Sequence, residues 1–343
     1  MILHVFNPEH DIALAAHLKN FTAPHAGRQL RHDLGFLPAL WAEADDVVLV
    51  DDIESIPRSW RYRCRCRLVE KRELARLKFD AIEPWGWDLA LRANLVRYGV
   101  DERLLPSEDA IEQIRLLSHR RVSAWLLPLL RVDGTVGEAF ECTTADDVDK
   151  LIGRYGRVVL KAPWSSSGRG LRFVTEMSHI EGWLKNLLTT QGSVMLEPYY
   201  NKVKDFGMEF YSDGNGNVGF LGLSLFHTAN GAYTGNVLAT ENAKREWISD
   251  YLPTSLLDAV QEQVCRLLGE RFRGCYCGPF GIDMMIVARD DRDGFLLHPC
   301  VEINLRRTMG HVALSLSPSD DEVKRVMRID YSNNNYKLII RRL

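Results

Sequence analysis

VEINLRR, residues 301–307, places Glu302 and Asn304 two positions apart inside a largely apolar run. Side chains of a β-strand alternate between its two faces, so a strand here would present Glu302 and Asn304 together. Packing does not explain why an apolar strand carries two oxygen-bearing side chains on one face. A bound hard cation would explain them, because Mg²⁺ takes oxygen ligands from one or two carboxylates and from substrate phosphates.

A further carboxylate, Asp283, lies in another apolar run, residues 278–287. Turn-forming residues fill positions 289–294 between the two runs and end in Asp-Gly, a strong hairpin signal. Strands paired across that turn would bring Asp283 beside Glu302 and Asn304. Each run alone is as compatible with an exposed strand face, because polar residues on one face are common. The pairing favours a metal site formed by Asp283, Glu302 and Asn304.

Lys161 ends a strand-like run, residues 157–161, and a loop rich in serine and glycine follows it at 162–170. Backbone amides in such a loop can cradle phosphate oxygens, because glycines permit close approach, and the lysine would add a positive charge. The loop is not a Walker A motif, since its lysine comes first. The alternative is a plain turn beside an incidental lysine.

A carboxylate also ends the strand-like run 193–197, where Glu197 is followed by Pro198 and Tyr199. A buried carboxylate at such a position can accept hydrogen bonds from a purine amine or a ribose hydroxyl. On its own, a glutamate on an edge strand is the commoner explanation.

The composition indicates a soluble globular protein, with 343 residues, 46% hydrophobic and 26% charged residues. A net charge of −3 argues against a nucleic-acid partner, which usually requires a basic surface. The seven cysteines lack zinc-knuckle spacing and are typical of a reducing compartment. With neither a signal peptide nor an apolar run of membrane-spanning length, we expect a cytoplasmic protein without a membrane partner.

Strand and helix patterns alternate over roughly the first hundred residues, with strands at 2–6 and 47–50 and helices such as 71–78 and 88–98, which predicts a parallel α/β sheet. From residue 136 the pattern changes, with helices near 145–153 and 178–189 between strands, and from 193 the chain is mainly strands, interrupted by a helix around 254–272. The change of pattern predicts separate domains, with boundaries at 1–115, 116–192 and 193–343.

The ordered set of motifs resembles the ATP-grasp superfamily over roughly residues 115–317. The resemblance implies an α/β N-terminal domain followed by an α+β ATP-grasp fold of two lobes. Asp283, Glu302 and Asn304 would hold Mg²⁺, and Arg306 would face an acyl phosphate. Arg120 or Arg121 would replace a second lysine usual in the superfamily. The implied contacts to ATP are Arg120, Lys161, Ser165, Ser166, Ser167, Gly168, Gly170, Glu197 and Tyr199, of which Lys161 is also implied in catalysis.

The function that the resemblance implies is an ADP-forming ligation of a small-molecule carboxylate to an amine through an acyl phosphate, with ATP and Mg²⁺ as cofactors. A phosphotransferase on the same fold and a non-catalytic nucleotide-binding regulatory protein are the alternatives. The residues identify neither the carboxylate nor the amine or thiol acceptor, and they leave the oligomeric state open, a homodimer included.

Three groups of residues are candidates for the acceptor side. Asn7, Glu9, His10 and Asp11 follow the first strand, where open parallel sheets bind ligands, although a capped helix start is slightly favoured. A long polar loop is expected at 227–236, and its glycines suit a segment that faces substrate. Gly310 and His311 open a helix after the metal strand, where backbone amides favour an anion.

Overall fold

The computed structural model describes residues 1–165, 170–229, 232–291 and 293–343. It divides into two compact units. Unit 1 comprises residues 1–115, 235–239 and 306–343, and unit 2 comprises 116–234 and 240–305. The segment expected to form one lobe, 193–343, is therefore divided, because its last residues pack with the N-terminal part of the chain.

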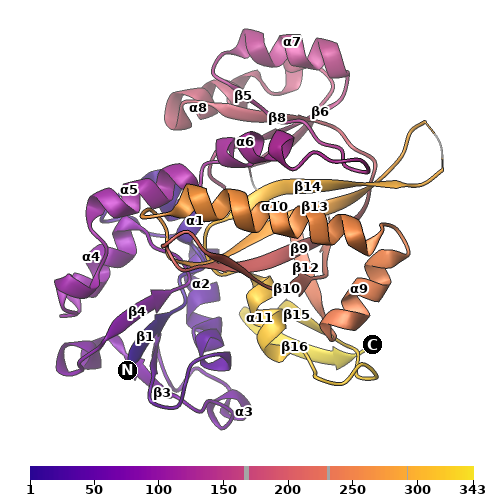
Figure 1. Ribbon diagram of the computed structural model, residues 1–343. Coiled ribbons are helices and arrows are strands. Elements are labelled where there is room, and N and C mark those ends of the chain that lie inside the picture. The colour runs from indigo at the N-terminus through magenta and orange to yellow at the C-terminus, as the bar shows by residue number, and fades with distance from the viewer. Residues whose placement is uncertain (166–169, 230–231, 292) are drawn as a thin grey trace. The chain divides into compact units, whose positions relative to one another are not determined.

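Unit 1 is built on a parallel sheet with the strand order β3-β2-β1-β4 (Figure 1). Leu3 of the first strand pairs with Val47 on one side and Ile82 on the other, and all three side chains are buried. The parallel α/β architecture predicted for this part of the chain is confirmed. The strands are β1 (Ile2–Val5), β2 (Val47–Val50), β3 (Arg67–Glu70) and β4 (Ala81–Pro84).

Short helices connect these strands. The helix predicted at 71–78 is instead a 3-10 helix that ends at Arg76. The helix predicted at 88–98 begins where Asp88 caps it, because its carboxylate accepts a hydrogen bond from the backbone N–H of Leu91 at 2.8 Å. The helices are α1 (His10–Ala16), α2 (His25–Leu34), η1 (Leu37–Leu40), α3 (Arg58–Arg61), η2 (Lys71–Arg76), α4 (Leu89–Arg97), η3 (Glu102–Leu104), α5 (Glu108–Leu117) and α11 (Met309–Leu316).

The C-terminal segment adds a hairpin to unit 1. Its strands β15 (Arg325–Ser332) and β16 (Asn335–Arg342) are joined by Asn333 and Asn334, both at positive φ. The end of β12 (Ala232–Leu238) pairs with β15, Asn236 lying opposite Met327. Met327 is fully buried in a core that this hairpin shares with the N-terminal residues of unit 1.

Unit 2 contains two antiparallel sheets. The first has the strand order β5-β8-β6-β7, with α7 and α8 packed on it around a core that includes Leu160, Leu184 and Leu196. Thr144 caps α7 as predicted, accepting a hydrogen bond from the N–H of Asp147. Its elements are β5 (Phe140–Cys142), β6 (Val158–Lys161), β7 (Leu171–Val174), β8 (Val194–Pro198), α7 (Ala145–Tyr155), η4 (Met177–His179) and α8 (Glu181–Gln191).

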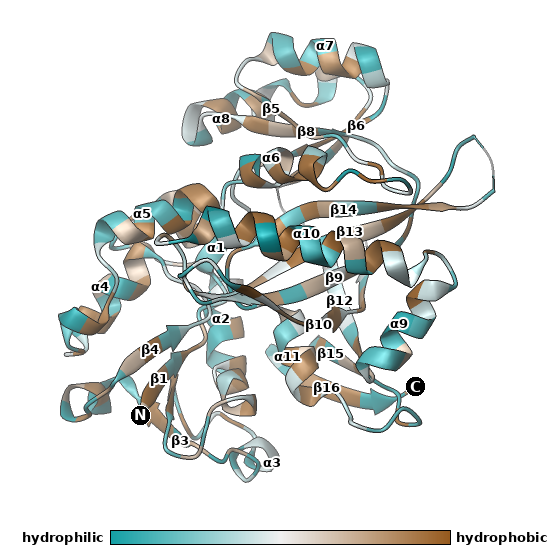
Figure 2. Ribbon diagram, viewed as in Figure 1, coloured by the Kyte–Doolittle hydropathy of each residue, from teal (hydrophilic) through white to brown (hydrophobic). Residues whose placement is uncertain are grey.

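The second sheet of unit 2 has the order β10-β9-β13-β14, and the long helix α10 packs on β9 and β10. Hydrophobic and hydrophilic residues interleave along α10 (Figure 2), as expected for a helix with one buried face. Phe210, Phe272 and Phe280 meet between helix and sheet. The elements are α6 (Arg121–Leu129), β9 (Lys202–Ser212), β10 (Val218–Ser224), β11 (Phe226–Ala229), α9 (Glu241–Ser249), α10 (Thr254–Phe272), β13 (Gly278–Ala288) and β14 (Phe295–Asn304).

None of the helices in the described ranges combines the length and the apolar character needed to cross a membrane.

Candidate active site

The predicted hairpin exists as β13 and β14, and its register aligns the metal-type residues. Asp283 lies directly opposite Glu302, and Asn304 lies opposite Gly281 in the next row of the same face. The opposite face buries Ile282. The sequence prediction that Asp283 would lie beside Glu302 and Asn304 therefore agrees with the strand pairing.

A fourth oxygen-bearing side chain, Glu209, was missed in the sequence. It lies on β9 opposite Gly281, in the row that also holds Asn304, and it is only 3% exposed. Gly207 lies beside these carboxylates, since a Cβ there would be 3.7 Å from both Asp283 Oδ1 and Glu209 Oε1, in ordinary contact distance. A lone carboxylate in an apolar strand was the signal used for Asp283, and the same signal marks Glu209.

The donor set suits a hard cation. No three His, Cys, Asp or Glu side chains of the described residues converge closely enough to hold a metal without other ligands. Asp283, Glu302 and Asn304 provide two carboxylates and one amide, which fits Mg²⁺ because this ion usually takes its remaining ligands from water and phosphate. Like charges directly opposite each other on adjacent strands are destabilising, so Asp283 and Glu302 need a neighbouring positive charge.

Arg120 supplies that charge. Its guanidinium donates to Glu302 Oε1 at 2.6 Å and to Ser165 Oγ at 2.9 Å, and a further bond to the Ala162 carbonyl holds it in place. Arg120 is 7% exposed, whereas Arg121 is exposed and lies near Glu141. The structure thus places Arg120, and not Arg121, between the start of the serine-rich loop and the carboxylates of the hairpin.

Lys161 and Glu197 form a buried ion pair. The ammonium of Lys161 lies 2.6 Å from Glu197 Oε1 and also donates to the Val301 carbonyl at 3.4 Å. Both side chains are more than nine-tenths buried. Burial raises the pKa of Glu197, and the charge of Lys161 opposes that rise. Glu197 therefore contacts the lysine, and its predicted contact with adenine or ribose stays a prediction.

The other residues predicted to contact ATP follow Lys161 and Glu197 in the sequence. Ser165 and Gly170 lie at the ends of the loop, so close that a Cβ on Gly170 would be 2.6 Å from Ser165 Cβ. Ser166, Ser167 and Gly168 lie outside the described residues. Tyr199, after β8, is 38% exposed, and the guanidinium of Arg157 lies 3.5 Å from the centre of its ring.

His298 is another residue near this site that the sequence did not single out. It lies on β14, is fully buried, and its ring is 5.4 Å from that of Tyr200. Neither ring nitrogen has a hydrogen-bond partner among the described residues. Burial lowers the pKa of His298 to about 3, helped by the positive charge of Lys161. A single histidine in the apolar run 295–300 gave no pattern to detect.

Arg306, predicted to face an acyl phosphate, belongs to unit 1. There its guanidinium donates hydrogen bonds from Nε and Nη2 to the Asp11 carboxylate, the shortest at 2.7 Å. Asp11 therefore pairs with an arginine, and the role expected of Arg306 toward an acyl phosphate stays a prediction.

Two expectations for the acceptor side are wrong in local structure. The polar loop expected at 227–236 is largely taken up by strands, β11 up to Ala229 and β12 from Ala232. The helix cap expected of the Asn7–Asp11 cluster is also absent, since α1 begins after Glu9 without a side-chain cap. Asn7 instead donates to the Gly86 carbonyl at 2.8 Å and to Asp88 at 3.0 Å.

The start of α11 is capped by its own side chains. The Thr308 hydroxyl accepts from the N–H groups of Gly310 and His311, and the His311 ring accepts from the Thr308 N–H. The N–H groups of Gly310 and His311, which were expected to bind an anion, therefore already have a hydrogen-bond acceptor. A contact of Gly310 or His311 with an acyl phosphate therefore stays a prediction.

Comparison with solved structures identifies the fold. Biotin carboxylase from Campylobacter jejuni in a β-γ-ATP complex matches with a TM-score of 0.54 and 16% identity, over 97% of this chain and 77% of that one. The biotin carboxylase domain of Hydrogenobacter thermophilus 2-oxoglutarate carboxylase, with MgADP, matches at 0.52 and 16% over 96% and 74%. N5-carboxyaminoimidazole synthetase from Staphylococcus aureus, with ADP, matches at 0.50 and 14% over 97% and 83%.

These three are ATP-grasp enzymes, so this chain has the ATP-grasp fold, as its motifs predicted. The identities of 14–16% are too low to transfer more than the fold. Neither a protein-family model nor a curated protein matches the sequence.

Proposed function

We propose that this protein is an ATP- and Mg²⁺-dependent ligase that joins a small-molecule carboxylate to an amine through an acyl phosphate, releasing ADP. The observation that carries the proposal is the position of Arg120, which links the serine-rich loop to Glu302. A loop predicted to close over phosphates and a carboxylate predicted to hold a cation thus share one arginine. Solved structures with this fold contain ADP, MgADP or β-γ-ATP, which supports a nucleotide as the ligand.

Lys161 and Arg120 are the groups that would bind the phosphates of ATP. Phosphoryl transfer depends mainly on positioning and on neutralising charge at the phosphate oxygens. The planar guanidinium of Arg120 can bind two phosphate oxygens at once, whereas Lys161 provides a point charge. Arg120 is paired with Glu302. A phosphate that binds Arg120 in place of Glu302 would free this carboxylate to coordinate a cation.

Asp283, Glu302 and Asn304 are the residues that would hold the cation. Mg²⁺, when bound, supplies neutralisation of charge on the phosphate oxygens. Arg306 is the residue we assign to the acyl phosphate, on the basis of its place two positions after Asn304.

We place the protein in the cytoplasm, where thiols stay reduced. All seven cysteines are free thiols.

The test is phosphate release from ATP in the presence of Mg²⁺, screened with amino acids and other small acids and amines. The parent should release phosphate when both a carboxylate and an amine are present, and Glu302→Gln should reduce the rate about a hundredfold or more. Glu262→Gln, which changes an exposed carboxylate on α10, is the matched control and should behave as the parent.

Two results would contradict the proposal. Phosphate transfer to an alcohol, with no dependence on an amine, would show a phosphotransferase instead. Tight nucleotide binding with no turnover for any acid and amine would show a regulatory nucleotide-binding protein.

A further inference from the structure

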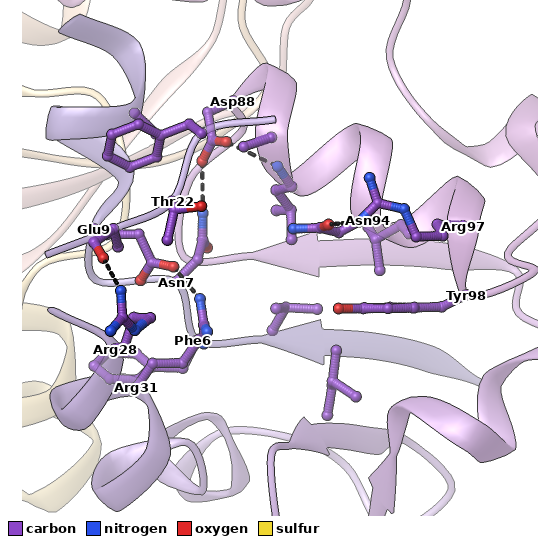
Figure 3. A pocket seen from close by; sticks show the side chains of 18 of the residues that line it. Phe6, Asn7, Glu9, Thr22, Arg28, Arg31, Asp88, Asn94, Arg97 and Tyr98 are labelled. Atoms are coloured by element: carbon purple, nitrogen blue, oxygen red, sulfur yellow. Dashed lines mark hydrogen bonds and ion pairs between the residues drawn. The ribbon is translucent and has the colours of Figure 1, made fainter. Parts of the chain in front are cut away.

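Unit 1 contains a pocket of about 300 Å³ at the carboxyl ends of its parallel strands (Figure 3). Asn7 follows β1, Asp51 follows β2, and Asp88 follows β4, and all three line the pocket. Open parallel sheets bind small ligands at this edge because the connections that leave the strands there present side chains and amides. None of the residues assigned above to ATP or Mg²⁺ lies in this pocket.

Glu9 is the acidic group available to a ligand in this pocket. Its side chain is 9% exposed, and Oε1 pairs with Arg31, but Oε2 has no partner among the described residues. Asp88, the other buried carboxylate, is already satisfied, since one oxygen caps α4 and the other accepts from Asn7. A buried carboxylate oxygen without a donor is costly, so Glu9 calls for an N–H or O–H group from a ligand.

Arg28 is a basic group available to a ligand, whereas Lys19 pairs with Glu108 and Arg97 donates to Asn94. Arg28 lies one turn before Arg31 on α2, so the two side chains share a face of the helix. Arg31 is committed to Glu9 and Asp51. Arg28 donates to the Ala23 carbonyl at 2.6 Å, and its other N–H groups have no partner in the described structure. A guanidinium with free N–H groups suits a carboxylate or a phosphate.

The far wall of the pocket carries one charged side chain, Arg97, whose guanidinium donates to Asn94 Oδ1 at 3.1 Å. Figure 3 shows Asn94 and Tyr98 on the side away from Glu9, Arg28 and Arg31. Leu91 and Leu95 add buried apolar surface. A ligand bound between Glu9 and Arg28 would therefore turn the rest of its structure toward Asn94, Tyr98 and this apolar surface.

We propose that this pocket binds a free α-amino acid, with its ammonium group on Glu9 and its carboxylate on Arg28. The ligand's two charges match the unpaired Oε2 of Glu9 and the remaining N–H groups of Arg28, and a volume of 300 Å³ suits one amino acid. The amino acid serves as the amine partner of the ligation, a role that rests on the function proposed above. Amino-acid binding itself does not depend on ATP.

The experiment is calorimetric titration of the full chain, without nucleotide, with each proteinogenic L-amino acid. The tightest ligand is then compared with its N-acetyl and methyl-ester derivatives, in the parent and in Glu9→Gln and Arg28→Met. We expect acetylation to weaken binding to the parent by about tenfold to a hundredfold, because a charged hydrogen bond is lost. Esterification should have a similar effect.

Each variant has lost one charged side chain, so blocking the ligand group that this side chain binds should no longer weaken binding. Glu9→Gln should bind the free and acetylated amino acids alike, and Arg28→Met should bind the acid and the ester alike. The exposed residues Glu43 and Arg58 provide the matched controls Glu43→Gln and Arg58→Met, which should bind as the parent does.

Absence of binding for every amino acid, or unchanged selectivity in both variants, would overturn the inference. Binding of inorganic phosphate in preference to any amino acid would overturn it as well. Because nucleotide is absent, these results are independent of phosphate release. If an amino acid binds but no phosphate is released from ATP, the result would contradict the proposed ligase function and would leave the amino-acid site unaffected.

Discussion

At the scale of single residues, the candidate site of unit 2 consists of cations that are already paired with carboxylates. Lys161 pairs with Glu197, and Arg120 pairs with Glu302. Removing one partner of a buried ion pair leaves an uncompensated charge, so these residues contribute to stability as well as to the proposed binding of ATP. Substitutions at the site must separate the two effects.

The variant Lys161→Met should lose stability and nucleotide affinity together. Because Glu197 would be left buried and unpaired, the free energy of unfolding should fall by about 3–5 kcal/mol. The affinity for ADP should fall about tenfold or more, since a charged contact to phosphate is lost. Urea unfolding and calorimetric titration measure the two quantities.

The double variant Lys161→Met/Glu197→Gln separates these effects. Because neither member of the ion pair then carries a charge, the double variant should recover most of the stability but none of the nucleotide affinity. Recovery of both would show that Lys161 acts only through the fold, and would remove it from the proposed ATP site.

His298 should make the protein less stable in acid. Its pKa in the folded protein is about 3, below the usual 6.5, because burial disfavours the charged ring. As the pH falls from 6.5, the unfolded chain binds a proton that the folded chain cannot bind, so His298 removes roughly 1 kcal/mol of stability per pH unit.

The variant His298→Phe cannot titrate at this position, so urea unfolding at several pH values should show a shallower loss of stability below pH 6.5 than in the parent. His179→Phe replaces an exposed histidine and should leave the slope unchanged. An identical slope in the parent and in His298→Phe would contradict the assignment.

At the scale of the elements, the connection between β6 and β7 depends on Gly170. A methyl group there would lie 2.6 Å from Ser165 Cβ, so Gly170→Ala should displace Ser165 and break its 2.9 Å bond with Arg120. Stability should fall by about 1–3 kcal/mol, and ADP affinity should fall with it.

The control is Gly153→Ala in α7, where a Cβ would meet nothing within 4 Å. The free energy of unfolding of this variant should rise by about 0.5–1 kcal/mol, because alanine favours the helix more than glycine does. Urea unfolding measures the difference. If Gly170→Ala bound ADP as tightly as Gly153→Ala, the loop would have no part in holding the nucleotide.

Elements with strong local signals could be predicted from the sequence. The β13–β14 hairpin was marked by two apolar runs around an Asp-Gly turn, but the alignment of Asp283 with Glu302 also depends on a register shift between Asp283 and Met285 that the turn does not set. The β15–β16 hairpin was missed although Asn333 and Asn334 form its two-residue turn, with φ of 54° and 60°. Asparagine tolerates this left-handed conformation, so the run of asparagines was a usable signal.

Contacts between distant residues could not be predicted. The sequence indicated Lys161 and Glu197 as separate contacts to ATP, but β6 and β8 are neighbours in the sheet and bring them together as an ion pair. Asn7 was expected to cap a helix, but its Oδ1 accepts from the N–H of Gly86 at 3.3 Å and its amide nitrogen donates to Asp88. Local patterns reveal which residue types are unusual, whereas their partners depend on the tertiary fold.

At the scale of the whole molecule, the chain crosses between its two compact units more than once. It enters unit 2 after residue 115, and the final crossing lies between Leu305 and Arg306. Asn304 and Arg306, which the sequence placed in one motif, therefore belong to different units. A linear reading could not reveal this division, because no change in composition marks it.

The central claim is that the β13–β14 hairpin binds a nucleotide through Mg²⁺. The most direct test is calorimetric titration of ADP with Mg²⁺ and with a chelator, in the parent, in Asp283→Asn/Glu302→Gln and in Glu262→Gln. Mg²⁺ should tighten binding by about tenfold or more in the parent and in Glu262→Gln, and should leave the double variant nearly unaffected. Equal tightening in all three proteins would contradict the claim.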